Sequence, residues 1–464
     1  MNAVIALASF GILSLFLGFL ENRKLLIYAT LVFILVALGL NIADWNKEYL
    51  WFNNMLRTNN LTINFANIIL IAGLCVVGIS RHFGEDKEHS HPAEYYAIML
   101  FALAGAIMMT NFENLLMLFI GLEVLSVSMY ILTGSDKRNF RSNEAALKYF
   151  LTGAFATGIF LFGVALIYGA TGSFNIHAIG NELNTKISFM GSMVYIGITM
   201  LLIGLLFKVS IAPFHFWTPD VYEGAPSLFT AFMSTVVKTA GFAAIYRITT
   251  TAFDSQYRYW WTFLIILTVL TILISNITAV YQKSFKRMMA YSSISHAAYL
   301  IIPIIAKTEA SPSAILFYSL SYTFATITAF AVFILVSEAN LVEGKPNEES
   351  SIFNGLAKNN PLLAVCLTVS MLSLAGIPLT AGFWGKFFVF STAIDRKIVW
   401  LLIYAILMSA VAIYYYFKPI INSYLKEGTQ SEIQIPFLYK VVIVFCTIAT
   451  ILLGVAPDLV KQIF

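Results

Sequence analysis

Long apolar runs follow one another along nearly the whole chain, and they constrain its fold more than any other feature. Each is about as long as the roughly 20 residues that an α-helix needs to cross the hydrocarbon core of a bilayer. Of the 464 residues, 59% are hydrophobic and only 11% are charged, and a water-soluble core of ordinary size cannot bury that much apolar surface. The sequence therefore predicts an all-α polytopic membrane protein.

Polar residues divide the chain into about fourteen predicted transmembrane helices. They cover residues 3–20, 25–43, 61–80, 94–111, 115–133, 144–168, 191–210, 228–251, 260–280, 288–306, 313–337, 361–376 with a continuation past a break, 398–417 and 437–456. Nothing between them resembles a soluble domain, so we expect a single membrane domain over 1–464. Its predicted parts are helices 1–3 in 1–90, helices 4–8 in 91–251, helices 9–13 in 260–418 and helix 14 in 437–456.

The distribution of basic residues among the loops predicts the orientation. The loops after the odd-numbered helices carry about twice as many Lys and Arg as the alternate loops, and basic residues in short loops favour the cytoplasmic side. With an even number of helices, both termini are expected outside. The first 20 residues lack the basic flank of a signal peptide, so we expect them to form a retained helix.

Two parts of the chain resemble each other when the sequence is compared with itself at a fixed offset. Ser126 falls on Ser295 and Tyr130 on Tyr299, and two further stretches match in the same order. They are Phe155-Ala156-Thr157 with Phe324-Ala325-Thr326, and Ser210–Pro213 with Ser373–Pro378. The copies are five helices apart, and an odd number reverses orientation in the membrane. The sequence therefore predicts two inverted five-helix repeats, a plan typical of transporters.

The third helix of each predicted repeat contains a proline, Pro213 in one and Pro378 in the other. Proline removes a backbone donor and breaks a helix. A broken helix is tolerated at membrane depth only where protein or a water-filled cavity satisfies its backbone. We therefore predict discontinuous helices 7 and 12 beside a transport path, with two ordinary proline kinks as the alternative.

Five ionisable residues are expected to lie deep in the apolar helices: Glu123, Lys148, Lys208, Lys238 and Lys386. An ion at the bilayer centre costs at least about 2.5–3.5 kcal/mol, so such residues usually face the protein interior and mark ion or proton paths. Glu123 is predicted to share a helical face with polar neighbours and to pair with a lysine on another helix. The sequence therefore predicts a proton path.

Two histidines are candidates for bridging the gaps between these lysines. His215 follows Pro213, and His296 lies in predicted helix 10. A histidine can exchange protons near neutral pH, and lysine can also lose its proton when buried, whereas arginine stays charged. Either histidine is also compatible with an ordinary core position whose hydrogen bonds are satisfied.

Several charged residues have simpler interpretations. Lys148 follows Glu144 by four residues, which allows an intrahelical ion pair, and Lys386 is compatible with an interfacial position. Arg247, near the end of helix 8, is expected to be an interface anchor. His89 and His91 lie in an acidic loop, and we interpret them as solvated rather than as metal ligands.

The three cysteines, Cys75, Cys366 and Cys446, are far apart in the sequence and each lies in an apolar run. An iron–sulfur or zinc site needs clustered ligands, and a disulfide framework is not indicated. The sequence also lacks a glycine-rich dinucleotide fingerprint after a strand. We therefore expect inert buried cysteines, no bound metal and no cofactor in this chain. A net charge of +4 is too small to indicate nucleic acid.

Between about residues 90 and 420 the sequence resembles the antiporter-like membrane subunits of respiratory complex I, and among them subunit N of bacterial NADH-quinone oxidoreductase. The most specific motifs are Gly121-Leu-Glu123, Glu144-Ala-Ala-Leu-Lys148, Phe207-Lys208-Val-Ser-Ile-Ala-Pro213-Phe-His215, and Leu374-Ala-Gly-Ile-Pro378-Leu-Thr-Ala-Gly-Phe-Trp-Gly-Lys386. The resemblance implies that Glu123, Lys208, Lys238 and Lys386 form a central polar axis. Lys148 and His215 match further residues of that axis.

The resemblance also implies a function and a setting. The chain is expected to pump protons from the cytoplasm while NADH reduces quinone in partner subunits that hold the flavin and the iron–sulfur clusters, so it is an enzyme only within the complex. Its partners would be sister membrane subunits in a bacterial inner membrane, with both termini periplasmic. A multi-subunit sodium/proton antiporter, a membrane-bound hydrogenase and a structural scaffold are the alternatives.

Overall fold

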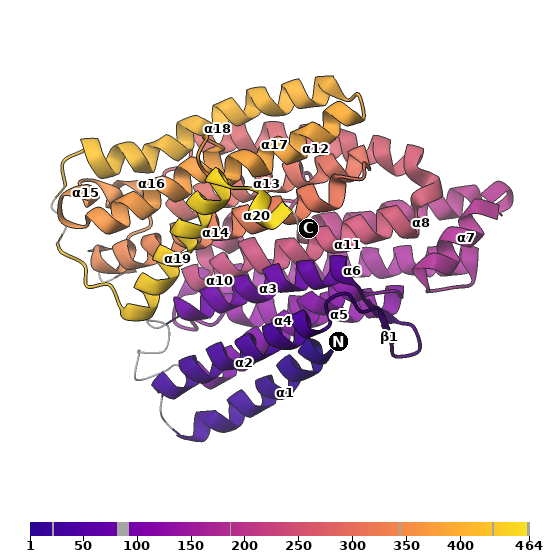
Figure 1. Ribbon diagram of the computed structural model, residues 1–464, viewed down its shortest axis with the longest axis horizontal. Coiled ribbons are helices and arrows are strands. Elements are labelled where there is room, and N and C mark those ends of the chain that lie inside the picture. The colour runs from indigo at the N-terminus through magenta and orange to yellow at the C-terminus, as the bar shows by residue number, and fades with distance from the viewer. Residues whose placement is uncertain (21–22, 81–91, 186, 343–344, 429–430, 462–464) are drawn as a thin grey trace.

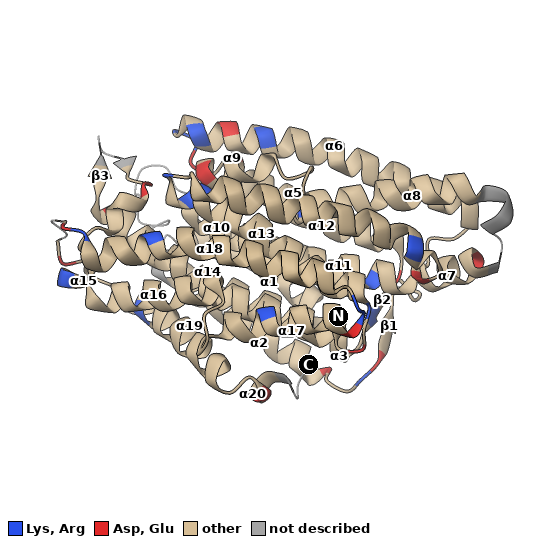
Figure 2. Cartoon of the chain, turned by 90° about the horizontal axis from the view of Figure 1, so that it is seen from above, with Lys and Arg blue, Asp and Glu red and all other residues tan. Residues whose placement is uncertain are grey.

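The computed structural model describes residues 1–464 except 21–22, 81–91, 186, 343–344, 429–430 and 462–464. Long helices run side by side along the long axis of the molecule (Figure 1). Lys, Arg, Asp and Glu gather mostly at the two ends of these helices, with long uncharged stretches between (Figure 2). This distribution is typical of a bundle that spans a bilayer.

The helices of the first half lie mainly in the lower and right-hand parts of Figure 1. They are α1 (Asn2–Leu17), α2 (Arg23–Ala43), α3 (Asn60–Gly78), α4 (Pro92–Asn111), α5 (Leu115–Thr133), α6 (Phe140–Thr171), α7 (Ile176–Thr185), α8 (Ile187–Lys208), α9 (Trp217–Gly224), α10 (Ser227–Phe232) and α11 (Lys238–Thr251). A π-helix, η3 (Met233–Val237), joins α10 to α11.

The second half continues the bundle with further long helices. They are α12 (Tyr257–Val280), α13 (Phe285–Ala306), α14 (Ser311–Ala339), α15 (Leu356–Asn359), α16 (Pro361–Ala375), α17 (Ala381–Asp395), α18 (Val399–Leu425), α19 (Phe437–Val455) and α20 (Asp458–Lys461). Short 3₁₀ turns η1, η4 and η5 cover Gly18–Leu20, Asp254–Gln256 and Ser350–Phe353. Two small antiparallel hairpins pair β1 (Tyr49–Trp51) with β2 (Leu56–Thr58), and β3 (Leu341–Val342) with β4 (Lys345–Pro346).

Among the described residues, thirteen helical segments are long and apolar enough to cross a membrane. The remaining predicted helix, the twelfth, is present as two shorter helices, α16 and α17. The all-α membrane fold is thus confirmed, while the inverted relation between its two halves stays a prediction. The hairpin β1–β2 and helix α7 were not expected, because a few residues between two apolar runs carry too weak a pattern.

The centre of the bundle is formed by α10–α11, α13 and α14. Their most apolar stretches are 94–100% buried within the chain, whereas those of α1, α2, α6 and α18 are 28–33% buried. Large apolar side chains such as Phe16, Phe155 and Leu407 are exposed on these outer helices. Outer helices with apolar surfaces are those that face lipid or other membrane subunits.

The first predicted interruption is present between α8 and α9. Helix α8 ends at Lys208, and Ser210 adopts a left-handed backbone conformation with φ of 67°. The Trp217 indole N–H donates to Phe207 O at 3.1 Å, and Thr218 Oγ1 donates to Ser210 Oγ at 2.7 Å. These bonds satisfy groups that the broken helix would leave unpaired in an apolar surrounding.

The second interruption separates α16 from α17. Gly376 ends α16 with φ of 84°, and a Cβ placed there would lie 2.7 Å from Lys386 Cδ. Glycine is therefore required both for the left-handed turn and for the passage of the lysine side chain. The Gly382 N–H donates to Ser373 Oγ at 3.1 Å, which closes the gap between the two halves.

A third irregularity was not predicted. Helix 8 was expected to be continuous over 228–251, but the π-helix η3 interrupts it and ends directly before Lys238. A π-turn leaves one backbone step without the usual α-helical pairing and is often found at functional sites. Because it contains no Pro or Gly, the residue types gave no signal for it.

Candidate functional site

Lys208 is buried at the end of α8, as predicted, with 3% of its surface exposed. Its ammonium donates to Ser126 Oγ of α5 at 2.8 Å and to Tyr149 Oη of α6 at 3.2 Å. It also lies 5.4 Å from the centre of the Tyr149 ring and 5.9 Å from that of Tyr130. Aromatic faces and hydroxyl oxygens both favour a cation, so this pocket can hold Lys208 protonated or neutral.

Glu123 differs from its prediction. It is half-buried on α5 and accepts a hydrogen bond from Thr157 Oγ1 of α6 at 2.9 Å. In the described part of the chain it forms no ion pair with a lysine. It is nevertheless close enough to Lys208 to interact with it electrostatically, and Ser126, one helical turn away, carries the hydrogen bond that the carboxylate was expected to accept. The sequence predicted a pair between Glu123 and a lysine, whereas the structure places Glu123 near Lys208 without direct contact.

Lys148 does not lie deep, and that prediction is wrong. Its side chain is 45% exposed and forms ion pairs with Glu144 at 2.8 Å and with Asp220 of α9 at 3.0 Å. Arg287 of α13 extends the chain of charges by pairing with Asp220 at 2.9 Å and with Glu223 at 2.8 Å. We call these five residues the ionic collar. It joins α6, α9 and α13, and the intrahelical pair with Glu144 was the simpler interpretation of Lys148.

Lys238 is 3% exposed at the start of α11, directly after the π-helix. Its ammonium donates a short hydrogen bond to the backbone oxygen of Ser293 in α13. A carbonyl in mid-helix already accepts a bond from its own helix, so this contact uses its second lone pair. Lys238 therefore connects the first half of the molecule with the helix that carries His296.

His296 is 4% exposed in α13. Lys238 and Lys386 are both close enough to interact with it electrostatically. Its Nδ1 is 2.6 Å from Tyr318 Oη and its Nε2 is 2.9 Å from Tyr416 Oη. Since one nitrogen can accept a proton while the other releases one, both sides of the ring are connected to hydroxyls that can carry it further.

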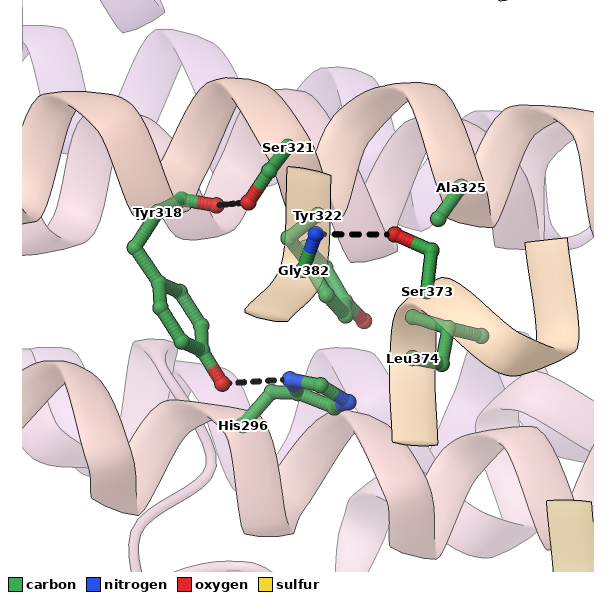
Figure 3. Close-up of a pocket in the computed structure, with 8 residues that line it drawn as sticks. All are labelled: His296, Tyr318, Ser321, Tyr322, Ala325, Ser373, Leu374 and Gly382. Atoms are coloured by element: carbon green, nitrogen blue, oxygen red, sulfur yellow. Dashed lines mark hydrogen bonds between the residues drawn. The ribbon is translucent and has the colours of Figure 1, made fainter. Parts of the chain in front are cut away.

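A small cavity borders this histidine. His296, Tyr318, Tyr322 and Ser373 are among its lining residues, and side chains from α13, α14 and the α16–α17 interruption converge on it (Figure 3). Its volume is about 10 Å³, which is close to the minimum that one water molecule needs. The lining offers both donors and acceptors, so a water here can link His296 to the second interruption.

Lys386 is 6% exposed in α17, which excludes the interfacial alternative. Its ammonium donates to Ala375 O at 2.7 Å and to Ser409 Oγ of α18 at 2.8 Å, and it lies 5.6 Å from the centre of the Tyr299 ring. Ala375 is the last residue of α16, and the unpaired carbonyls of a helix C-terminus favour a positive charge. The broken helix thus provides part of the lysine's electrostatic partner.

His215 is buried in the first interruption, and its ring lies 4.6 Å from that of Phe216. It was predicted to bridge between lysines, but within the described residues its ring forms no hydrogen bond with Lys208 or Lys238. The loop histidines His89 and His91 lie outside the described residues. Within the described residues, no group of three or more His, Cys, Asp or Glu side chains could hold a metal ion.

Arg247 was expected to be an interface anchor, and the structure corrects this. It is 7% exposed, and its guanidinium pairs with Glu113 at 2.7 Å while donating to Thr110 O at 2.5 Å. His177 of α7 lies 3.0 Å from the other oxygen of Glu113. Seven helical segments, α5 to α10 and η3, separate Glu113 from α11, which carries Arg247, so spacing gave no signal for this buried ion pair. The Glu113–Arg247 ion pair connects segments at the end of the bundle opposite the ionic collar.

Comparison with known proteins assigns this arrangement to a family. The family described as "NADH:quinone oxidoreductase/Mrp antiporter, TM" matches residues 113–412. NADH-quinone oxidoreductase subunit N of Flavobacterium psychrophilum is 39% identical over 463 residues, covering 100% of both chains. The protein of the same name from Cytophaga hutchinsonii is also 39% identical, over 100% of this chain and 99% of the relative.

Comparison with solved structures leads to the same family. A chain of respiratory complex I from Thermus thermophilus superimposes with a TM-score of 0.85 at 33% identity, covering 99% of this chain and 98% of that one. A chain of the Mrp complex from Dietzia has the same fold, with a TM-score of 0.86 at 20% identity over 100% and 96% of the two chains. The chain therefore belongs to the family of antiporter-like membrane subunits that includes NADH-quinone oxidoreductase subunit N.

Proposed function

We propose that the chain conducts protons through a path formed by Lys208, Lys238, His296 and Lys386. As a member of the family above, it is a membrane subunit of a proton-translocating NADH-quinone oxidoreductase. NADH oxidation and quinone reduction would take place in partner subunits that carry the flavin and iron–sulfur clusters. The observation that carries the proposal is the burial of three lysines and a histidine, each bonded to a hydroxyl or carbonyl oxygen.

The path combines groups that can each gain and lose a proton. Lys208 is held by Ser126 and Tyr149, so it keeps hydrogen-bond partners in either protonation state. Lys238 and Lys386 are both close enough to act on His296 electrostatically, and a charge on either disfavours a charge on the histidine. A proton that reaches one lysine therefore favours release from its neighbour. Such alternation moves charge without requiring all groups to be charged together.

Glu123 would set the charge of the first lysine. A carboxylate near Lys208 favours its protonated form, and movement of Glu123 or neutralisation by a partner removes that effect. Glu123 is only half-buried within this chain. An ionised carboxylate is too costly to leave against lipid, so its open side is expected to be covered in the assembly.

The face that contains Glu123 also suggests where a partner subunit packs. Helix α6 exposes Leu147, Leu151 and Phe155 next to the partly exposed Lys148. Apolar side chains interspersed with ionisable ones fit neither pure lipid nor water. We therefore place another polytopic membrane subunit of the complex against α5 and α6, in a bacterial inner membrane.

Substitution of Lys208 tests this function directly. In the assembled complex, Lys208→Ala is expected to leave subunit content unchanged and to reduce NADH-driven proton translocation by more than about tenfold, since a group in the proton path is removed. Lys440→Ala, an exposed lysine on α19, is the matched control and should pump normally. If Lys208→Ala assembles and pumps like the control, the proposed function is wrong and the lysine has only a packing role.

A further inference from the structure

Two cysteines that are far apart in the sequence are neighbours in the structure. Cys75 lies in α3 and Cys446 in α19, and the thiol of Cys446 donates a hydrogen bond to Cys75 Sγ at 3.8 Å. Both side chains are buried, with 4% and 0% of their surface exposed. The expectation that the cysteines are buried is confirmed, and the structure adds that two of them are neighbours, whereas Cys366, the third free cysteine, lies in α16.

The two helices meet closely beside the thiols. A Cβ added to Gly78 of α3 would lie 2.6 Å from Val442 Cγ2 of α19. Gly78 follows Cys75 by about one turn of α3, whereas Val442 precedes Cys446 by about one turn of α19. Because these residues meet in pairs, the two helices run antiparallel. The absence of a side chain at Gly78 allows this close approach. The two sulfurs are thus held together by packed helices rather than by a loop.

We propose that Cys75 and Cys446 form an oxidisable pair that a small peroxide converts to a disulfide between α3 and α19. The sulfur atoms must approach from 3.8 Å to about 2.05 Å, the length of a disulfide bond. One sulfur first attacks a peroxide oxygen to form a sulfenic acid. The second sulfur then displaces water from it. Overall two thiols and one hydrogen peroxide give one disulfide and two waters, with two electrons passing from sulfur to oxygen.

The bond would tie the C-terminal helix to the N-terminal part of the chain. Helix α19 supports α17, because the Trp384 indole N–H donates to Gly454 O at 2.9 Å. Helix α17 carries Lys386. The disulfide would therefore restrict the movement of α19. Through the hydrogen bond from Trp384, it would also restrict the movement of α17, which follows the second interruption. The proposal does not depend on proton conduction, and its test reads out the covalent bond alone.

The experiment uses membranes that contain the assembled complex. They are treated with hydrogen peroxide, denatured in the presence of N-ethylmaleimide, digested and analysed by mass spectrometry. We expect a linked peptide pair containing Cys75 and Cys446 that disappears after treatment with dithiothreitol, and Cys366 in its alkylated form. The conservative variant Cys446→Ser should lose the linked pair without forming a link between Cys75 and Cys366.

Two outcomes would overturn the proposal. One is the recovery of Cys75 and Cys446 as alkylated thiols or as sulfinic acids, with no linked peptide, over the peroxide range in which the complex stays intact. The other is a link from either residue to Cys366, since that would show that thiol reactivity rather than proximity decides the product. Because the wild-type complex gives the principal result, the test does not depend on the folding of a variant.

Discussion

The two interrupted helices place a buried lysine in different electrostatic surroundings. At the first, Lys208 lies near the carboxylate of Glu123 and is bonded to two hydroxyls. At the second, Lys386 is bonded to a helix C-terminal carbonyl and to Ser409, and His296 is close enough to interact with it electrostatically. A carboxylate lies near the first lysine, whereas the direct partners of the second are dipoles. We therefore expect Glu123 to favour the charged form of Lys208 more than the surroundings of Lys386 favour its charged form.

The second halves of the broken helices are also fixed in different ways. Helix α9 is held by the ionic collar through Asp220 and Glu223. Helix α17 is held by neutral hydrogen bonds, from Trp384 to Gly454 O and from the Gly382 N–H to Ser373 Oγ. A partly exposed set of ion pairs responds to ionic strength, and neutral hydrogen bonds do not. We therefore expect the packing of α9 to depend on salt concentration and that of α17 to be independent of it.

The largest expected effect concerns whether the two lysines act in series. Lys208→Ala and Lys386→Ala should each reduce proton translocation by more than about tenfold, and the double variant should be no worse than either single one, because one break already stops a serial path. The measurement is NADH-driven acidification of closed membrane vesicles. If each single variant retained half of the activity and the double variant none, the two halves would conduct independently.

A smaller loss is expected from breaking the connection between them. His296→Gln keeps a hydrogen-bonding side chain of similar size but cannot exchange protons near neutral pH. It should reduce pumping about tenfold at most, while Tyr416→Phe, which removes one hydroxyl next to the same ring, should have a milder effect. Equal loss in both variants would indicate that the polar cluster acts through packing alone.

A substitution can remove the difference in charge between the surroundings of Lys208 and those of Lys386. Ser409→Asp would place a carboxylate beside Lys386 and make the second site resemble the first. We expect the rate of proton translocation to fall several-fold, because the lysine would be held in its charged form. Ser409→Asn has nearly the same shape without the charge and should retain most of the activity. If Asp and Asn variants behave alike, the charge balance at the second site has no functional role.

The smallest effect is expected at the ionic collar. Asp220→Asn should lower the stability of the purified complex to heat by about 0.2–1 kcal/mol, the usual range for partly exposed ion pairs. The difference from wild type should shrink in 1 M salt, where the Debye length is about 3 Å. Trp384→Phe, which removes a neutral bond, should show no such salt dependence. A salt-independent loss for Asp220→Asn would mean that the collar acts by shape.

The sequence predicted those parts of the molecule that depend on residue type in a local pattern. Runs of about 20 apolar residues located the membrane helices, and Pro213 and the Gly376–Pro378 turn located the two interruptions, because each residue acts on its own backbone. Lys208, Lys238 and Lys386 were recognised as buried from the apolar residues around them. All three are 3–6% exposed in the structure.

The sequence could not predict features that depend on how distant helices pack. Glu113 and Arg247, and likewise Cys75 and Cys446, meet only in the folded bundle. Lys148 has apolar neighbours in the sequence, yet it faces outward on α6 because a helix exposes whichever side its partners leave uncovered. The π-helix before Lys238 has no signal in composition. These features follow from tertiary contacts rather than from local propensity.

Proton translocation by a complex that carries Lys238→Ala tests the central claim most directly, because Lys238 is buried and bonds to the helix that carries His296. The measurement compares protons moved and NADH oxidised in closed vesicles with the same content of assembled complex. The proton path predicts that proton translocation falls by more than about tenfold. Wild-type rates of NADH oxidation together with a wild-type number of protons per NADH would contradict it.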